Sequence, residues 1–428
     1  MKEGQDDLFY LTPTLSRIQN SIQMQQSKRN SSSTSNNIHN NASSNLFLNG
    51  GLAATQLGLD PMINKRHAPI VHHDNYSFDN WPASHTFPMD KFRMTAFSLL
   101  NDSDDSMQQT EATTESDQFR GDPLVLSPTH FYKPLSLEFF PTSFLSPPVC
   151  PNYLHSFLSG TLTKEQSRLI GFREHTSRHE IIQRTVTEVA GTVLTAQLAL
   201  KYGLASHTAG GTHHAQSGEG RGFTILNDLA VVASLMTWKE EDEVEGIDDV
   251  KLLREFYRGN GAKRVLVVDL DVHQGDGTAT FHAKGSLLHN KLFTLDLHAT
   301  NNYPFQKQQC TYDVSLSDEC NDDEYMEALI GSLDKAIQEV DPQLILYNAG
   351  VDPYQHDKLG RLSLSWEGLR QRDDHVIRKC VDEKIPVACV VGGGYDVDVR
   401  ALGRRHALVS RVCGEIWREK EMWQGIKD

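Results

Sequence analysis

The 428-residue chain has few basic residues for its length, no cysteine pairs and no long apolar runs. Its 41 Lys and Arg face 56 Asp and Glu, a formal charge of −15. That balance argues against a protein held on nucleic acid mainly by phosphate contacts, so no direct DNA binding is expected. The absence of any run of 18 or more apolar residues excludes a membrane-spanning helix. The acidic start, Met1–Asp7, is followed by no compact apolar stretch and argues against a secretory signal.

The spacing of the cysteines and of the glycines argues against zinc-finger proteins and against nucleotide-binding proteins with a phosphate loop. The six cysteines form no CxxC pair and no zinc-finger pattern, so we expect reduced thiols in a reducing compartment. There is no GxGxxG and no Walker lysine, which argues against a phosphate-cradling loop. With 38% hydrophobic and 23% charged residues, the chain can bury a core. A soluble intracellular globular protein is the expectation that remains.

Residues 1–66 differ from the rest in charge and composition. They hold six basic and four acidic side chains, which leaves −17 for the remainder. Asn30–Asn45 is 12 Ser or Asn out of 16 residues and cannot bury enough apolar surface to offset its ordering entropy. We favour a low-complexity, disordered tail. The alternative is an organellar transit peptide, because Leu8–Leu59 has Ser and basic residues but no acid.

Two later stretches are strongly acidic. Residues 101–122 hold seven acids and one Arg, and residues 239–249 hold seven acids and one Lys. Neither has metal-ligand spacing by itself. Both are therefore predicted to be solvated surface insertions.

From about His130 onward, short apolar runs alternate with helical periodicity. The predicted strands are Arg264–Leu270, Leu292–Leu297, Leu344–Tyr347 and Ile385–Val391, and the predicted helices are Ile181–Leu200, Met326–Val340 and Ser365–Val381. Such alternation predicts an α/β fold with a mostly parallel sheet and helices on both faces. In such sheets the chemistry lies at the carboxyl ends of the strands.

The run RVLVV leads into polar residues that suit a metal. In an extended chain Asp269, Asp271 and His273 would point to one face, because side chains alternate with period two. One imidazole with carboxylates suits zinc or a similar ion. The competing interpretation is a surface strand end that makes turn and capping bonds. Asp352, after LILYNAG, would supply a further ligand, although an Asp before Pro is usually a turn residue.

Two further features follow glycines. Gly210 and Gly211 precede His213 and His214, a pair that can serve as general base and electrostatic partner or acid. A rival pair, His72-His73, has no glycines and no strand, and we assign it to the surface or to local packing. Ile385–Val391 runs into three glycines and Tyr395, whose phenol could donate to an oxyanion. A tight turn with a packed ring is the alternative there.

Each feature is ambiguous alone, but together there are four of them at successive strand ends. Together they resemble the zinc-dependent histone deacetylase family, which has the three-layer arginase/deacetylase fold. The resemblance runs from about His67 to Arg418 and rests on GGTHHA, GFTILND, VVDLDVHQGDGTA, LYNAGVDP, DKLGRLSLSWEGLRQRD and VVGGGYDVDV. YNAGVDP, LGRLSLS and the upstream HTFPMDKF (His85–Phe92) look most like class IV deacetylases and their bacterial relatives. A catalytic domain over residues 67–420 is implied.

The resemblance implies a role for each residue that matches its motifs. The zinc ligands would be Asp271, His273 and Asp352. The catalytic residues would be His213 and His214, oriented by Asp269 and Asp276, with Tyr395 donating to the oxyanion. The channel for the acyl-lysine would be lined by Phe223, Tyr303, Gly393 and Gly394. Several family members also bind K⁺ near the DLDVH strand and the strand that carries Asp296.

Two departures from the family pattern accompany the resemblance. His273 is followed by Gln274, where many members have a second histidine. The segment Phe139–Tyr153 looks expanded and has Val149 and Cys150 where members often place His and Asp. That segment lies on the substrate side in relatives, so contacts at the rim of the site are expected to differ.

The implied activity is zinc-assisted removal of acetyl or longer acyl groups from lysine side chains of histones or other proteins. The rival functions are an acetylpolyamine or small-molecule amidohydrolase and a non-catalytic acyl-lysine binding scaffold. An arginase-type dimetal hydrolase fits less well, because there is no second carboxylate cluster. The expected location is the nucleus or cytoplasm, or an organelle if the tail is a transit peptide.

Overall fold

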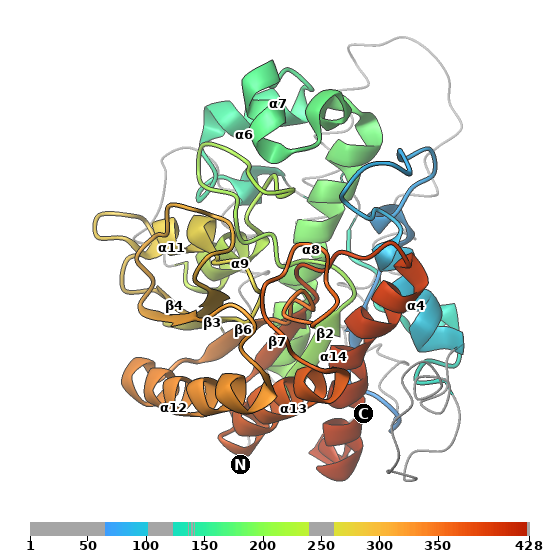
Figure 1. The fold of residues 1–428 in the computed structure, drawn as a ribbon, viewed down its shortest axis with the longest axis vertical. Coiled ribbons are helices and arrows are strands. Elements are labelled where there is room, and N and C mark those ends of the chain that lie inside the picture. The colour runs from blue at the N-terminus through green and yellow to red at the C-terminus, as the bar shows by residue number, and fades with distance from the viewer. Residues whose placement is uncertain are drawn as a thin grey trace, which may run out of the picture.

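A computed structural model describes residues 65–101, 123–135, 137, 140, 142–238 and 261–425 (Figure 1). Nearly all of the predicted tail (residues 1–64), residues 102–122 of the first acidic stretch and the whole second stretch (239–249) lie outside the described residues.

A seven-stranded sheet forms the centre of the molecule, and every neighbouring pair of strands is parallel. The order across the sheet is β1-β2-β7-β6-β3-β4-β5. The strands are β1 (Ile70–Val71), β2 (Leu204–His207), β3 (Val265–Asp269), β4 (Leu292–Ala299), β5 (Tyr312–Leu316), β6 (Leu344–Asn348) and β7 (Val387–Val390).

The described residues form nine α-helices. They are α4 (Lys91–Asn101), α6 (Pro151–Leu158), α7 (Lys164–Ile170), α8 (His179–Tyr202), α9 (Asp228–Met236), α11 (Asp276–His282), α12 (Asp322–Val340), α13 (Trp366–Asp382) and α14 (Val399–Glu419). Short 3-10 helices are η1 (Asp74–Tyr76), η2 (Pro128–His130), η3 (Thr142–Leu145), η4 (Arg173–Ser177) and η6 (Met422–Gly425).

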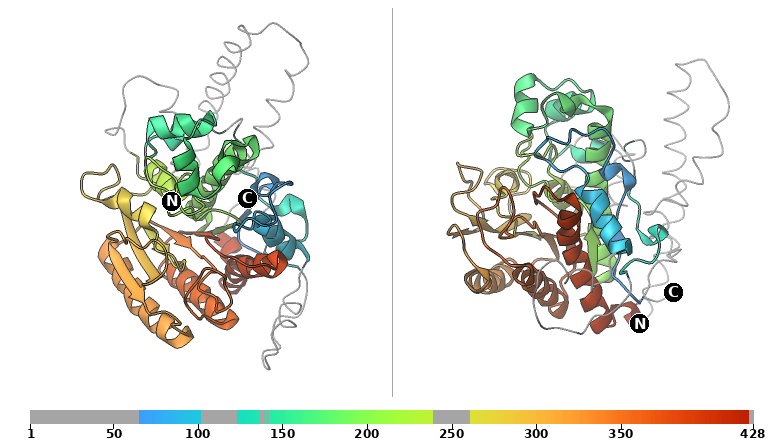
Figure 2. Two further views of the ribbon diagram at one scale, coloured as in Figure 1. Left: turned by 45° about the horizontal axis from the view of Figure 1, so that its top comes forward. Right: turned by 45° about the vertical axis from the view of Figure 1, so that its right-hand side comes forward.

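The sheet is covered on both faces. Helix α8 packs on β2, β7 and β6, with α9 against it and α11 beside β4. On the other face α12 packs on β3, β4 and β5, α13 on β7 and α14 on β2 (Figure 1). Helix α4 runs beside α14, although the two are far apart in the sequence (Figure 2). This is the α/β architecture of the arginase/deacetylase fold, as predicted.

Local sequence signals set the limits of the helices. Helix α12 begins after Asn321, which forms a capping box with Glu324. Helix α8 is buried almost all round, because it lies between the sheet and α9, and it ends at Gly203 with φ of 86°. The buried strand β3 has an exposed side chain on neither face, which explains its continuous apolar sequence.

The predicted strands and helices are all present, but the sequence reading missed the strands β1, β2 and β5 and the helices α4, α6, α7, α9, α11 and α14. Strand β2 has the sequence LASH, whose Ser206 and His207 are buried polar residues that hide the apolar pattern. Strand β5 lies at the edge of the sheet with alternating exposure, so Tyr312–Leu316 is too polar to resemble a central strand. Tertiary packing, and not local propensity, places both.

Three smaller expectations can be compared with the structure. The Nδ1 atom of His72 lies 2.7 Å from Oγ1 of Thr208 in the interior, so His72 belongs to local packing. All six cysteines are described, and none is in a disulfide. The part of the chain that the structure describes contains no helix long and apolar enough to cross a membrane.

Candidate active site

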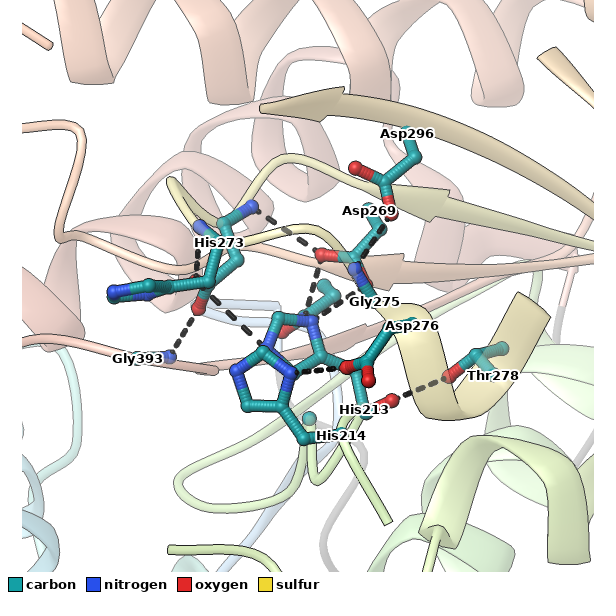
Figure 3. Close-up of polar contacts among 12 residues, drawn as sticks. His213, His214, Asp269, His273, Gly275, Asp276, Thr278, Asp296 and Gly393 are labelled. Atoms are coloured by element: carbon teal, nitrogen blue, oxygen red, sulfur yellow. Dashed lines mark hydrogen bonds and ion pairs between the residues drawn. The ribbon is translucent and has the colours of Figure 1, made fainter. Parts of the chain in front are cut away.

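The predicted site residues converge because their four strands are neighbours at the centre of the sheet. In the order β2-β7-β6-β3, each strand is followed by one of the predicted features. The register aligns Asp269 with Asn348 across β3 and β6. His213 and Gly393, which are 180 positions apart, therefore meet at the carboxyl ends of parallel strands (Figure 3).

Asp271, His273 and Asp352 form a buried group that could hold a metal ion. One possible ligand atom from each lies within 4.8 Å of the other two. Nδ1 of His273 lies 3.1 Å from Oδ1 of Asp271 and 3.1 Å from Oδ2 of Asp352. No second such group is found in the residues that the structure describes.

Asp271 and His273 come together because the chain bends after β3, and not because side chains alternate along an extended strand. Strand β3 ends at Asp269, and residues 271–273 turn so that the N–H of His273 donates to Oδ1 of Asp271 at 3.0 Å. The prediction that Asp269, Asp271 and His273 share one face of an extended strand is therefore wrong. Asp269 instead faces His213, while His273 faces Asp352.

The donor set fits a divalent cation. Burial disfavours the imidazolium of His273, but its bonds to Asp271 and Asp352 outweigh burial and raise its pKa to about 10. Two carboxylates thus attract positive charge into an interior position, which is the environment of a cation site. Backbone N–H groups of Gly393 and Val272 donate to Asp271 at 2.7 Å and to Asp352 at 2.8 Å, and so orient both carboxylates.

Glycine is required at position 393. A Cβ atom there would collide with the carboxylate oxygens of both Asp352 and Asp271. The backbone can donate to Asp271 only because nothing larger than hydrogen stands between the strand end and the group. The glycine run after β7 therefore permits close approach of the backbone to the candidate metal position.

His213 is paired with Asp269. Its Nδ1 lies 2.8 Å from Oδ2 of Asp269, whose other oxygen accepts from Nδ2 of Asn348 at 2.8 Å. Burial disfavours the imidazolium, but the charges of Asp269 and Asp271 outweigh it, and the pKa of His213 lies well above its usual range. The positive form of this ring is therefore the stable one.

His214 is paired with Asp276 but has the opposite charge preference. Its Nδ1 lies 2.7 Å from Oδ1 of Asp276, and its ring centre lies 4.1 Å from that of His213 (Figure 3). Burial and the positive His213 lower the pKa of His214 to about 4. Two adjacent rings thus differ in protonation, which suits one to accept a proton and the other to supply one.

Asp228 and Asn227, which the sequence reading did not assign, hold the histidine loop. Asp228 accepts from the backbone of Gly211 at 3.0 Å and of Thr212 at 2.8 Å. Nδ2 of Asn227 donates to the carbonyl of His213 at 3.3 Å. Both residues end the motif GFTILND at the start of α9, so the signal was present as a polar pair before an apolar helix.

Tyr395 lines the same pocket as the histidines. It is buried, and its ring centre lies 6.3 Å from that of His273 and 6.0 Å from that of Phe223. Burial raises the pKa of Tyr395 well above its usual range, so the phenol keeps its proton. Asp357, also unassigned from sequence, accepts from the backbone N–H of Tyr395 at 2.6 Å and fixes this loop.

Two of the four predicted channel residues, Phe223 and Gly393, line the same pocket. Phe223 is half-buried and has φ of 65°, a left-handed backbone that a bulky residue rarely adopts. Its ring stacks on Phe172, with ring centres 5.9 Å apart. The ring of Tyr303 meets that of His214 edge-on at 4.9 Å. Gly393 is half-buried beside the metal group, while Gly394 is buried against His406.

Asp296, at the predicted K⁺ position, is paired with Asp269 across β4 and β3. One of its oxygens accepts from the N–H of Gly275 at 2.7 Å. The other is buried and has no hydrogen-bond partner among the described residues. Burial and the charge of Asp269 raise its pKa well above the usual range. An alkali cation at this carboxylate stays a prediction.

The segment before α6 contains Val149 and Cys150, the two positions that differ from the family pattern. Val149 is buried in the core, and Cys150 precedes α6 and donates its N–H to the carbonyl of Ser217 at 2.7 Å. Positions 149 and 150, where family members often have His and Asp, therefore provide core packing and a backbone hydrogen bond in this chain.

Comparison with known proteins agrees with this geometry. The model of the histone deacetylase domain matches residues 150–410. An uncharacterized protein of Picosynechococcus sp. is 36% identical over 349 residues, which cover 82% of this chain and 99% of that protein. Histone deacetylase 2 of Arabidopsis thaliana is 28% identical over 250 residues, 57% of this chain and 58% of its own.

A further relative is the acetoin utilization protein AcuC of Staphylococcus aureus. It is 25% identical over 257 residues, which cover 56% of this chain and 59% of AcuC. The chain thus spans about three fifths of the length of these two named relatives. The domain match extends over more than half of the sequence and contains every predicted site residue. The chain belongs to the histone deacetylase family.

Proposed function

We propose that this chain is a zinc-dependent amidohydrolase that removes acetyl groups from the side-chain nitrogen of lysine in histones or other proteins. One observation carries the proposal. The Asp271–His273–Asp352 group, two His–Asp pairs and a protonated tyrosine surround the same pocket. Those are the parts that hydrolysis of an amide requires: a cation site, a proton acceptor, a proton donor and an oxyanion donor.

The ligand group supports Zn²⁺ by its chemistry, because zinc accepts imidazole and carboxylate donors. A bound Zn²⁺ would polarise the amide carbonyl and lower the pKa of a nearby water molecule. The protein then has two tasks. It must hold the carboxylates in place, which the N–H groups of Val272 and Gly393 do, and it must move protons.

His214 is the proton acceptor in this proposal. Its Nδ1 is engaged by Asp276, which leaves Nε2 to take the proton of the attacking water. The imidazolium of the pair then protonates the leaving lysine amine, so that the amide C–N bond breaks to a carboxylic acid and an amine. Tyr395 donates its O–H to the tetrahedral oxyanion. Phe223 and Tyr303 would flank the methylene chain of the substrate lysine.

The finer assignments are proposals that rest on sequence motifs. We infer a class IV deacetylase from YNAGVDP and LGRLSLS, with a catalytic domain over residues 67–420 and an N-terminal appendage. The net charge of −15 favours Lys-rich protein tails over DNA as partners, and hence a role at chromatin in the nucleus or in the cytoplasm. An organelle follows instead if the appendage is a transit peptide.

A turnover screen of the zinc-loaded protein tests the proposal. Acetyl-lysine peptides are compared with acetylspermidine, and the Tyr395→Phe variant serves as the impaired control. Release of lysine amine from peptides supports the proposed activity. Turnover of acetylspermidine alone would assign a small-molecule amidohydrolase, and peptide binding at one equivalent without turnover would assign a binding scaffold.

A further inference from the structure

Gln274 stands where many family members have a second histidine, directly after the candidate ligand His273, and its side chain is fully buried. The bend after β3 sends the two neighbouring side chains to different partners. His273 lies against Asp271 and Asp352, whereas Gln274 reaches the loop between β4 and β5, residues 300–311. Because a buried amide is held by its hydrogen bonds, these contacts define what Gln274 does.

Both hydrogen atoms of the Gln274 amide are used. Its Nε2 donates to the carbonyl of Gln308 at 3.0 Å and to Oδ1 of Asp313 at 2.8 Å. Its Oε1 accepts from the backbone N–H of Gln308 at 2.8 Å. Gln308 is thus bound through both of its backbone polar groups, as in a hydrogen-bonded pair of residues on antiparallel strands. The residue after a candidate ligand therefore fixes the 300–311 loop at this point.

A histidine at position 274 could not make the same set of bonds. A neutral imidazole has one N–H donor and one acceptor, which point in different directions. The amide of glutamine has two donors and an acceptor side by side, so it can pair with the N–H and the carbonyl of one residue and still donate to Asp313. The departure from the family pattern at this position therefore has a structural consequence in the loop.

The loop that Gln274 holds brings Tyr303 to the site. The ring centre of Tyr303 lies 4.9 Å from that of His214 and 6.5 Å from that of His273. A Cβ atom added to Gly222, which lines the pocket, would lie 3.2 Å from Cε1 of Tyr303. A shift of the loop would therefore move the Tyr303 ring relative to the proposed proton acceptor and to the path of the substrate lysine.

Side-chain bonds decide where this loop lies. Residues 300–311 are all described and form neither helix nor strand. Nζ of Lys307 donates to the carbonyl of Asn302 at 2.7 Å, and Nδ2 of Asn302 donates to the carbonyl of Leu359 at 2.7 Å. Gln274 adds the bonds that join the loop to the end of β3, which carries the candidate ligands.

From these contacts we infer that Gln274 is a positioning residue. It fixes the 300–311 loop so that Tyr303 forms a rigid wall beside His214, and it thereby raises the affinity of the site for the methylene chain of the substrate lysine. The inference rests on the proposed function, to which it adds a residue that acts through Tyr303 and not on the reacting atoms.

A double-mutant cycle tests whether Gln274 acts through Tyr303. The probe is a peptide with the methyl ketone analogue of acetyl-lysine, in which a CH₂ group replaces the amide N–H and prevents hydrolysis. On the zinc-loaded full chain, Gln274→Ala and Tyr303→Ala should each raise the Kd of this peptide by roughly three- to tenfold, and the double variant should bind about as weakly as Tyr303→Ala alone. Gln274→His should give a Kd between those of Gln274→Ala and wild type.

The matched control is Gln343→Ala. Oε1 of Gln343 accepts from the backbone N–H groups of Lys263 and Arg264, before the amino ends of β3 and β6, so this variant loses comparable bonds far from the pocket. Its Kd should equal that of the wild type. A double variant whose loss of affinity is the product of the two single losses would overturn the inference, because Gln274 would then act independently of Tyr303.

Hydrogen–deuterium exchange separates this inference from the proposed function. Residues 300–311 should exchange roughly tenfold faster in Gln274→Ala than in the wild type or in Gln343→Ala. Lys307→Met removes another bond of the same loop at a half-buried position, and should also speed exchange without opening the interior. Unchanged exchange in Gln274→Ala would overturn the inference even if acetyl-lysine peptides are hydrolysed. Faster exchange in a protein that neither binds nor hydrolyses them would support the positioning of the loop while the proposed function fails.

Discussion

At the scale of single residues, charge decides what each side chain of the site can do. His213 and His214 are neighbours in sequence with equivalent carboxylate bonds, yet their pKa values shift in opposite directions. The difference arises because His213 faces both Asp269 and Asp271, whereas His214 faces the positive His213. A neutral ring and a positive ring at one pocket are the pair that proton transfer in both directions needs.

Replacement of Tyr395 by Phe should remove a single hydrogen-bond donor. Tyr395 lines the pocket but is not part of the ligand group, so zinc content should stay at one equivalent. The loss of an oxyanion donor predicts a fall in kcat of about 10²- to 10³-fold with little change in KM. Steady-state kinetics with metal analysis measures both. Undiminished kcat in this variant would remove the oxyanion role.

Asp352→Ala should affect the metal first. Asp352 is fully buried and supplies one of the three candidate ligand atoms, and its loss leaves two donors. The expected result is a variant that retains well under one equivalent of zinc after dialysis, with activity lost in parallel. Elemental analysis gives the answer, with Tyr395→Phe as the comparison. Full zinc occupancy would refute the assignment of Asp352 as a ligand.

At the scale of elements, the loops after β2, β3, β6 and β7 are held by hydrogen bonds with residues of other elements. Gly393 of the β7 loop donates to Asp271 after β3, and Asp357 beyond β6 accepts from Tyr395. Asp228 at the start of α9 holds the β2 loop. Each loop is thus positioned by a polar residue from a different element, which keeps the site rigid without regular structure of its own.

A methyl group at position 393 tests this close approach. Gly393→Ala would place a Cβ against the oxygens of Asp271 and Asp352, so metal affinity should fall by about 10- to 100-fold. Gly331→Ala is the matched control, because Gly331 lies in α12 with nothing within 4 Å of the added atom. Competition with a chelator measures the affinity. Equal zinc affinity in the two variants would contradict the packing argument.

Titration of Asp357 should make the stability of the Tyr395 loop depend on pH. Burial and the charge of Asp352 raise its pKa to about 7. Because the pKa is higher in the folded than in the unfolded state, the stability that this carboxyl contributes is full below about pH 4 and is lost as the pH rises through 7. The Asn side chain of the Asp357→Asn variant cannot ionise. The unfolding temperature (Tm) of this variant relative to that of the wild type should therefore rise as the pH increases from 5 to 8. Parallel curves for the two proteins would contradict this prediction.

At the scale of the whole molecule, the sequence predicted the centre of the sheet and the residues that follow it. Strands β3, β6 and β7 are nearly continuous apolar runs because helices cover both faces, and that pattern is visible without a structure. The polar residues directly after the strands had to meet, since the carboxyl ends of parallel strands share one edge. The bend at residues 271–273 was not predictable from alternation.

The supporting residues could not be predicted because their partners are remote in sequence. Lys91 donates to Gly392, 301 positions away, and Arg411 donates to Ser98, 313 positions away. Nothing local distinguishes Lys91 from a surface lysine, or Glu188 from an exposed acid on a helix. Only the packing of α4 and α8 around the pocket makes them part of its wall. Motifs therefore reveal the reacting residues, whereas the residues that build the pocket wall can be identified only from the folded structure.

The most direct test of the account is hydrolysis of an acetyl-lysine peptide by the full chain carrying one equivalent of zinc. The account predicts stoichiometric release of acetate and free lysine amine, loss of that activity after removal of the metal by a chelator, and its return when Zn²⁺ is added. The Asp352→Ala protein should stay inactive throughout. Absence of turnover of every acyl-lysine peptide by folded protein with a full equivalent of zinc would contradict the account.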